Sequence, residues 1–258
     1  MARQDNTRLT KLERRELARE KARVLREEQE KREKRNRMLL IGGILGVIVI
    51  VALVVVAIVM NSNRSAFADV AEPAGTEEGG FSLSALDVAG DSTGDPKVQV
   101  YLDYACSWCN LFEQQYAADI KEMNEAGEAE FWFYPVALLD NSNDFTAFSG
   151  LAANASGTVM EHAPDQWAAF NEQLFITYAA NPSAMLPEIE AAAATAGVPA
   201  EVIARFADGE FRDWVDATTR NFLRNVARGT PEVRVDGETL VQWTDENALQ
   251  DAIAAARG

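Results

Sequence analysis

The stretch that decides the fold predicted for this chain is Val98-Gln99-Val100-Tyr101-Leu102-Asp103-Tyr104-Ala105-Cys106-Ser107-Trp108-Cys109. Its first half, residues 98–103, is an apolar run of the kind that forms a strand. The residues after the second cysteine, 110–116, favour a helix. Cys106 and Cys109 are the only two cysteines of the 258 residues. They therefore form a CxxC motif at a strand-to-helix junction.

The CxxC motif predicts a redox-active pair of thiols. A zinc site needs four ligands, usually Cys or His, but the chain has no third cysteine and its only histidine is His162. A purely structural disulfide over so short a loop removes little entropy from the unfolded chain. A thiolate at a helix N-terminus is stabilised by unpaired N–H groups and by the helix dipole. We therefore expect Cys106 to be the nucleophile and Cys109 to resolve the mixed disulfide, with no metal.

Residues 38–60 form a run of 23 apolar residues that is interrupted only by three glycines. As a helix, this run is long enough to span a bilayer. Residues 1–37 carry 14 Lys and Arg against 8 Asp and Glu, whereas residues 61–258 carry 10 against 32. The positive-inside rule then predicts a single-pass protein of the cell membrane, with a charged cytoplasmic helix over 1–37 and residues 61–258 outside the cytoplasm.

A cleavable signal peptide is the alternative to a retained anchor. Its apolar region is about 7–15 residues after a short basic start, whereas 37 residues precede a longer run here. Ala66-Phe67-Ala68 nevertheless offers an A-x-A-like site, so the sequence leaves open whether the anchor is cleaved after Ala68. The compartment outside the cytoplasm is oxidising, which suits a CxxC that is cycled by partners.

The rest of the chain predicts a linker over 61–80 and a folded domain over 81–258. Phe81-Ser82-Leu83 favours a short edge strand, and residues 130–135 favour a buried strand that completes a right-handed βαβ unit. Helical spacing of aromatic residues indicates an α-helical insertion at about 141–228. The end of the chain predicts strands at 232–235 and 239–243 around a turn at Asp236-Gly237. An N-cap sequence at 244–247 and a final helix at 248–257 follow.

Gly229-Thr230-Pro231 stands just before the late strand. With the CxxC, the helical insertion and the final hairpin and helix, it carries a resemblance over residues 81–258 to membrane-anchored DsbA-like thiol-disulfide oxidoreductases of the thioredoxin superfamily. The resemblance implies an α/β thioredoxin-like fold with an inserted α-helical subdomain, preceded here by a single transmembrane helix. It also implies that Thr230 and Pro231 form a cis-proline loop that faces the CxxC and binds substrate.

The same resemblance implies an enzyme that forms disulfides in unfolded or newly exported cysteine-containing proteins. A membrane redox partner of the DsbB or VKOR type would recharge it. We expect a monomer that needs no cofactor and binds no nucleic acid. Two alternatives stay open: a membrane-tethered reductase that keeps exported cysteines reduced, and a non-catalytic interaction domain.

The residues beside the cysteines have alternative roles. Well-known oxidising members of the family have Pro-His between the cysteines, whereas this chain has Ser107-Trp108. We expect Ser107 to help stabilise the Cys106 thiolate, or only to favour the helix start, and Trp108 to contact substrate, or only to pack. Asp103 is either a carboxyl group that exchanges a proton with Cys109 or a half-exposed carboxylate at a strand end. Glu113 has the same two alternatives, of which we favour the structural one.

Overall fold

The computed structural model describes residues 11–62, 66–67, 69–83, 96–140 and 145–258. Within the first of these ranges, side chains lie outside the description at 11–18, 22, 41, 44–45, 47 and 56–62. The chain divides into two compact units, residues 1–64 and 65–258, and each is described by itself.

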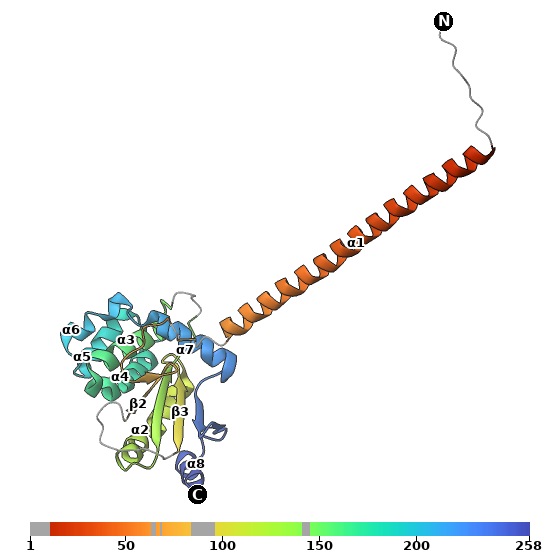
Figure 1. Ribbon diagram of the computed structural model, residues 1–258. Coiled ribbons are helices and arrows are strands. Elements are labelled where there is room, and N and C mark those ends of the chain that lie inside the picture. The colour runs from red at the N-terminus through yellow and green to blue at the C-terminus, as the bar shows by residue number, and fades with distance from the viewer. Residues whose placement is uncertain (1–10, 63–65, 68, 84–95, 141–144) are drawn as a thin grey trace. The chain divides into compact units, whose positions relative to one another are not determined.

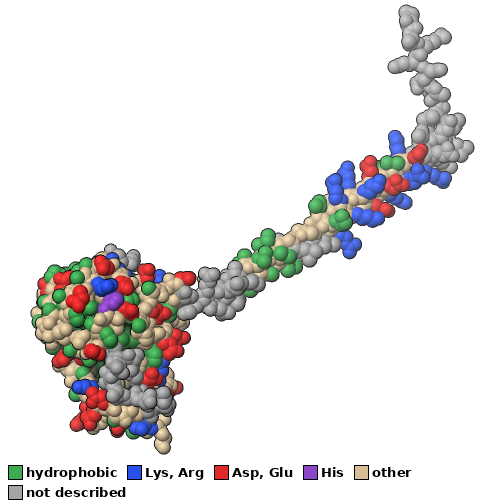
Figure 2. Space-filling model, turned by 60° about the vertical axis from the view of Figure 1, so that its left-hand side comes forward, with side chains coloured by type: hydrophobic (Ala, Val, Ile, Leu, Met, Phe, Trp, Pro, Cys, Tyr) green, Lys and Arg blue, Asp and Glu red, His purple; other side chains and the backbone are tan. Residues whose placement is uncertain are grey.

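The first unit contains one long helix, α1 (Lys11–Ser62). Lys and Arg side chains gather along its N-terminal half among acidic ones (Figure 2), as in the i,i+4 pair of Arg23 and Glu27 at 3.9 Å. Among the side chains that are described, no helix is long and apolar enough to cross a membrane. The predicted span 38–60 includes positions 41, 44–45, 47 and 56–60, whose side chains lie outside the described residues.

The second unit is built on a sheet in the order β1-β2-β4-β3-β5-β6. The strands are β1 (Thr76–Glu77), β2 (Gly80–Ser82), β3 (Lys97–Leu102), β4 (Glu130–Pro135), β5 (Glu232–Val235) and β6 (Glu238–Thr239). β3 and β4 are parallel, and the other neighbouring pairs are antiparallel. The helix α2 (Ser107–Glu125) connects β3 to β4. The predicted βαβ unit is therefore confirmed.

Both faces of the central strands are covered, which explains their composition. Every residue of β4 after Glu130 is buried, because a strand covered on two faces places apolar side chains on both. The larger apolar cluster includes Val98 and Val100. The smaller cluster includes Tyr101 and Tyr134, whose rings stack at 4.3 Å. β3 is thus held firmly up to the point where the CxxC begins.

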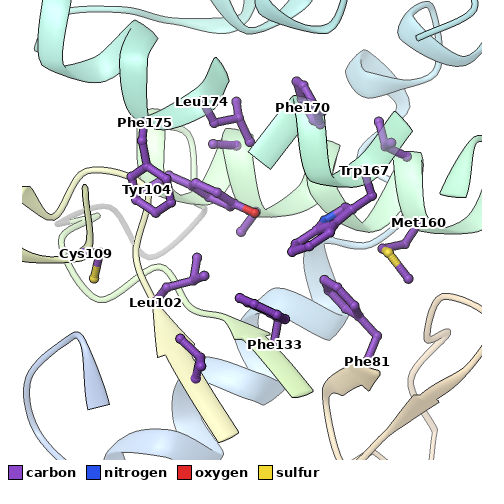
Figure 3. Packing of buried hydrophobic residues seen from close by; sticks show 14 of the residues in the cluster. Phe81, Leu102, Tyr104, Cys109, Phe133, Met160, Trp167, Phe170, Leu174 and Phe175 are labelled. Atoms are coloured by element: carbon purple, nitrogen blue, oxygen red, sulfur yellow. The ribbon is translucent and has the colours of Figure 1, made fainter. Parts of the chain in front are cut away.

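The helical insertion comprises α3 to α7 and lies between β4 and β5 in the chain. Figure 1 shows α3, α4, α5 and α6 packed together above the strands. The ring of Trp167 lies 4.7 Å from that of Phe81 and 5.1 Å from that of Phe133, which joins the insertion to the sheet (Figure 3). The α-helices of the insertion are α3 (Phe148–His162), α4 (Trp167–Ala180), α5 (Leu186–Thr195), α6 (Ala200–Ile203) and α7 (Arg212–Asn225). Of the predicted range 141–228, residues 141–144 lie outside the described residues.

The domain begins before the predicted boundary at Phe81, so the linker predicted for 61–80 was too long. Residues from 65 onward belong to the second unit, and Phe67 is 8% exposed in its core. Gly79-Gly80 lies inside the predicted linker, but a Cβ on Gly80 would overlap the ring of Tyr134. Glycine is there because two chain segments pack closely. Cleavage after Ala68, which itself lies outside the described residues, would remove Phe67 from this core.

Two further predictions for strands differ from the structure. β2 pairs with β1 on one side and with β4 on the other, so it is not an edge strand. The strand predicted at 239–243 ends at Thr239. The backbone carbonyl of Trp243 instead accepts a hydrogen bond of 2.6 Å from the hydroxyl of Tyr116 in α2. The Trp243 carbonyl is thus bonded to a side chain of α2, in place of the backbone hydrogen bond to a neighbouring strand that a longer strand would make.

The N-cap predicted within residues 244–247 is confirmed in position, but it lacks a capping hydrogen bond. The final helix α8 (Ala248–Ala256) begins after Asn247, which has a left-handed backbone with φ 62° and makes no side-chain cap hydrogen bond. Asparagine tolerates this backbone better than most residues. Asn247 therefore allows the sharp turn into α8 without capping it.

Candidate active site

The CxxC lies where the chain turns from β3 into α2. The N–H of Cys106 donates to the carbonyl of Asp103 at 2.9 Å, which closes a tight turn. Cys106 has an extended backbone and is the N-cap residue of α2. The first N–H groups of a helix have no partner within the helix. The sulfur of Cys106 is therefore placed among unpaired backbone donors.

The structure brings the predicted Thr-Pro loop to the cysteines. β5 pairs antiparallel with β3, with Tyr101 opposite Glu232, so the residues just before β5 arrive beside the end of β3. The Thr230–Pro231 peptide bond is cis. The thiol of Cys106 donates to the carbonyl of Thr230 at 3.3 Å. Two segments that are 124 residues apart in the sequence thus meet at one sulfur.

The two cysteines are free thiols in different environments. The hydrogen bond from the Cys109 thiol, together with those from the Thr230 side chain and from the N–H groups of Cys109 and Trp108, lowers the pKa of Cys106 to about 5 against the effect of burial. Burial raises the pKa of Cys109 well above its ordinary value. Cys106 is thus suited to be an attacking thiolate, and Cys109 stays protonated.

We expect the alkylation of Cys106 by iodoacetamide to have its midpoint near pH 5, since only the thiolate reacts. Because folding lowers this pKa, the thiolate stabilises the reduced fold fully above the ordinary thiol pKa of 9.0, and this stabilisation is lost as the pH falls through about 5. The measurement is the alkylation rate as a function of pH, with mass spectrometry to confirm that Cys106 is the residue modified. A midpoint near 9 would contradict it.

Asp103 is fully buried, so the alternative of a half-exposed strand-end carboxylate was wrong. Its Oδ1 accepts hydrogen bonds from the Ala105 N–H at 2.8 Å and the Ser149 hydroxyl at 2.6 Å, and its Oδ2 accepts one from the Leu139 N–H at 2.8 Å. The Asp103 N–H donates to the sulfur of Cys109 at 3.5 Å. Burial raises the pKa of Asp103 to about 6. An acid with this pKa exchanges protons readily near neutral pH.

Glu113 is buried on α2, and its Oε1 accepts a hydrogen bond of 2.9 Å from the amide of Asn171 in α4. Burial raises the pKa of Glu113 to about 7. Its partner belongs to the helical insertion, and this favours the structural alternative for Glu113.

The two residues between the cysteines are exposed. Among the described residues, the Ser107 hydroxyl makes no hydrogen bond to Cys106, and the N–H groups of Trp108 and Cys109 support the thiolate instead. The side chain of Trp108 is 56% exposed, and its ring lies edge-on to that of Trp243 at 6.3 Å. Trp243 in turn packs on Phe112 at 5.7 Å. Trp108 and Trp243 together form an apolar surface next to the CxxC.

Sequence reasoning missed Ser149, Asn171 and Trp243. The first two lie in the insertion and reach the site from 46 and 58 residues away, and no local pattern signals such pairs. Trp243 was placed in a strand, although an aromatic residue after the hairpin was a visible signal. In the described part of the chain, no group of three or more His, Cys, Asp or Glu could hold a metal ion.

A family model described as Thioredoxin matches residues 86–255. The chain belongs to the thioredoxin family. A search of the curated proteins found no match.

Solved structures similar to this thioredoxin-family chain include MdbA, a thiol-disulfide oxidoreductase from Actinomyces oris, with 23% identity over 75% of this chain and 94% of that chain and a TM-score of 0.60. MdbA from Corynebacterium diphtheriae has 17% identity over 75% and 99%, with a TM-score of 0.58. Oxidised BdbD from Bacillus subtilis has 18% identity over 74% and 100%, with a TM-score of 0.56. At these identities the likeness shows the fold, and the activity is argued from the site.

Proposed function

We propose that this protein is an extracytoplasmic thiol-disulfide oxidoreductase that forms disulfides in exported proteins. The observation that carries the proposal is the pair of unequal thiols, with the lowered pKa of Cys106 beside the Thr230 carbonyl and the raised pKa of Cys109 behind it. Two of the similar solved structures are themselves named thiol-disulfide oxidoreductases, which supports this chemistry.

The reaction begins with the oxidised Cys106–Cys109 disulfide. A client thiolate attacks the sulfur of Cys106, so a mixed disulfide forms and Cys109 leaves as a thiolate. Because the pKa of Cys109 is high, this thiolate takes up a proton. Asp103, a buried acid whose backbone N–H contacts the Cys109 sulfur, supplies it. A second client thiolate then attacks the client sulfur of the mixed disulfide, and Cys106 leaves as a thiolate. The client loses two electrons, and the protein gains them.

Client binding uses the Thr230-Pro231 loop and the apolar surface formed by Trp108 and Trp243. The carbonyl of Thr230 already accepts a hydrogen bond from Cys106, and an extended client segment can pair with this backbone as an added strand. Pro231 has no N–H and leaves the neighbouring main chain open to that pairing. The exposed ring of Trp108, with Trp243 beside it, then contacts apolar side chains that flank the client cysteine.

The second candidate function, a reductase, shares every one of these residues. The lowered pKa of Cys106 favours the oxidase, because a stable thiolate stabilises the reduced protein and is a good leaving group. The test is the reduction potential of the full chain in detergent, titrated against glutathione. A value near about −120 mV supports the oxidase, and one near about −270 mV or below supports the reductase.

We further propose that residues 38–60 anchor the protein in the cell membrane, with the N-terminus in the cytoplasm and a DsbB- or VKOR-type partner in the same membrane. The apolar run and the charge difference between 1–37 and 61–258 support this. In intact cells, a membrane-impermeant maleimide is expected to label Cys106 once the protein is reduced. Labelling only after lysis would place the domain inside the cytoplasm and contradict the proposal.

A further inference from the structure

A chain of buried hydrogen bonds runs through five side chains that thiol exchange does not use. The Trp167 indole N–H donates to the Ser156 hydroxyl at 2.8 Å. The Tyr104 hydroxyl lies 2.9 Å from that oxygen and 3.0 Å from the Asn171 side-chain carbonyl. The Asn171 amide donates to Glu113 at 2.9 Å. None of the five is more than 9% exposed.

The direction of this chain follows from what each group can donate. An indole N–H only donates, and an ionised carboxylate only accepts. Since the NH₂ of Asn171 is turned to Glu113, its carbonyl oxygen faces Tyr104, which must donate to it. Tyr104 has one proton, so Ser156 donates to the Tyr104 oxygen. This arrangement satisfies every group, and loss of one member leaves its buried neighbours unpaired.

This chain of hydrogen bonds joins the thiol site to the helical insertion. Tyr104 stands two residues before Cys106, in the turn between β3 and α2, and Glu113 lies on α2, which carries Cys109. Ser156 lies on α3, and Trp167 and Asn171 lie on α4. Figure 3 shows the hydroxyl of Tyr104 pointing toward Trp167. Both segments that place the cysteines are thus tied to α4, and the turn that contains Tyr104 is tied to α3 as well.

We propose that Tyr104 and Asn171 are positioning residues of the thiol site, through which the insertion holds residues 104–106 so that Cys106 stays within hydrogen-bond distance of Thr230. The catalytic consequence rests on the proposed function, whereas the positioning does not. The support of the Cys106 thiolate depends on its distances to the Thr230 side chain and to the N–H groups of Trp108 and Cys109 in α2. Breaking this chain of hydrogen bonds lets the turn at residues 104–106 relax and weakens the support of the thiolate.

The test substitutes Tyr104→Phe in the full chain and measures the rate of Cys106 alkylation by iodoacetamide against pH. We expect the midpoint to rise by about one pH unit, so that below the midpoint alkylation is about tenfold slower. The matched control is Tyr178→Phe on α4, whose ring packs on Phe148 at 4.9 Å and which is expected to keep the original midpoint. A folded Tyr104→Phe protein with an unchanged midpoint would overturn the proposal, even if its unfolding free energy had fallen.

A second pair of variants gives an answer if Tyr104→Phe fails to fold. Glu113→Gln keeps an oxygen that accepts from Asn171, whereas Glu113→Leu removes it. Glu113 is protonated near the Cys106 midpoint of about pH 5, because burial raises the pKa of Glu113 to about 7, so neither substitution removes a charge there. We expect Leu to raise the midpoint and Gln not to raise it. Equal midpoints for the two variants would count against positioning.

These readouts separate the proposal from the proposed function. Iodoacetamide needs no client, so the midpoint reports the site even if the protein oxidises no protein thiol. The titratable groups beside Cys106 are Cys109 and Asp103, and none of the variants changes them. Suppose that the wild-type protein has no oxidase activity and that Tyr104→Phe still shifts the alkylation midpoint. This result would overturn the proposed function and support the positioning role.

Discussion

Replacing Cys106 with serine is expected to abolish thiol-disulfide exchange. The serine hydroxyl is a far weaker nucleophile than the Cys106 thiolate, and it cannot form a disulfide. The buried Cys109 is 2% exposed and cannot replace it. We expect at least about a thousandfold loss of the rate at which the oxidised full chain introduces disulfides into a reduced client protein, measured by trapping free client thiols over time.

The companion variant Cys109→Ser separates an enzyme from a non-catalytic interaction domain. It keeps the attacking thiolate but removes the resolving thiol, so mixed disulfides between Cys106 and clients should accumulate and disappear on addition of reductant. Non-reducing electrophoresis with mass spectrometry detects them. No client oxidation by the unchanged protein, together with no adducts for Cys109→Ser, would favour the interaction domain instead.

Replacing Trp167 with alanine is expected to have the largest effect on stability. This indole is 2% exposed, contacts the rings of Phe81 and Phe133, and donates to Ser156. The substitution leaves a large cavity between the insertion and the sheet, and the Ser156 hydroxyl loses the hydrogen bond that it accepts from the indole. We expect the free energy of unfolding to fall by about 3–5 kcal/mol, measured by urea denaturation followed by circular dichroism.

Trp108→Ala is the matched control for that substitution. The Trp108 side chain is 56% exposed, so its removal should change the free energy of unfolding by less than about 1 kcal/mol. A similar loss of stability in both variants would mean that the packing of Trp167 does not hold the insertion on the sheet.

The sequence was sufficient to predict the parts of the fold that depend on local patterns. The apolar run before the CxxC became β3, the helix after it became α2, and these with β4 made the expected parallel unit. The position of Thr230 beside Cys106 came from the resemblance, because a Gly-Thr-Pro alone signals only a turn. Its contact with the sulfur depends on strand pairing across 124 residues.

Where prediction failed, long-range packing decided the outcome. Asp103 stands at the end of a strand, a position that often faces solvent. Here Leu139 and Ser149, both from later segments, cover it and donate to its carboxylate. Gly79 and Gly80 stood in the predicted linker, although the missing side chain of Gly79 makes room for Phe67 and Thr218 and that of Gly80 makes room for the Tyr134 ring. A local pattern cannot tell a residue that needs freedom from one that needs space.

In the proposed reaction, the burial of Cys109 sets how long a client stays attached to Cys106. Within a mixed disulfide, a client with a second reactive thiol departs oxidised, whereas a client with only one cysteine departs when Cys109 attacks the sulfur of Cys106. That attack requires the Cys109 thiolate, which is scarce because burial raises the pKa of Cys109. The buried thiol therefore makes release by Cys109 slow. Clients that can complete their disulfide have time to do so, and those that cannot are released unchanged.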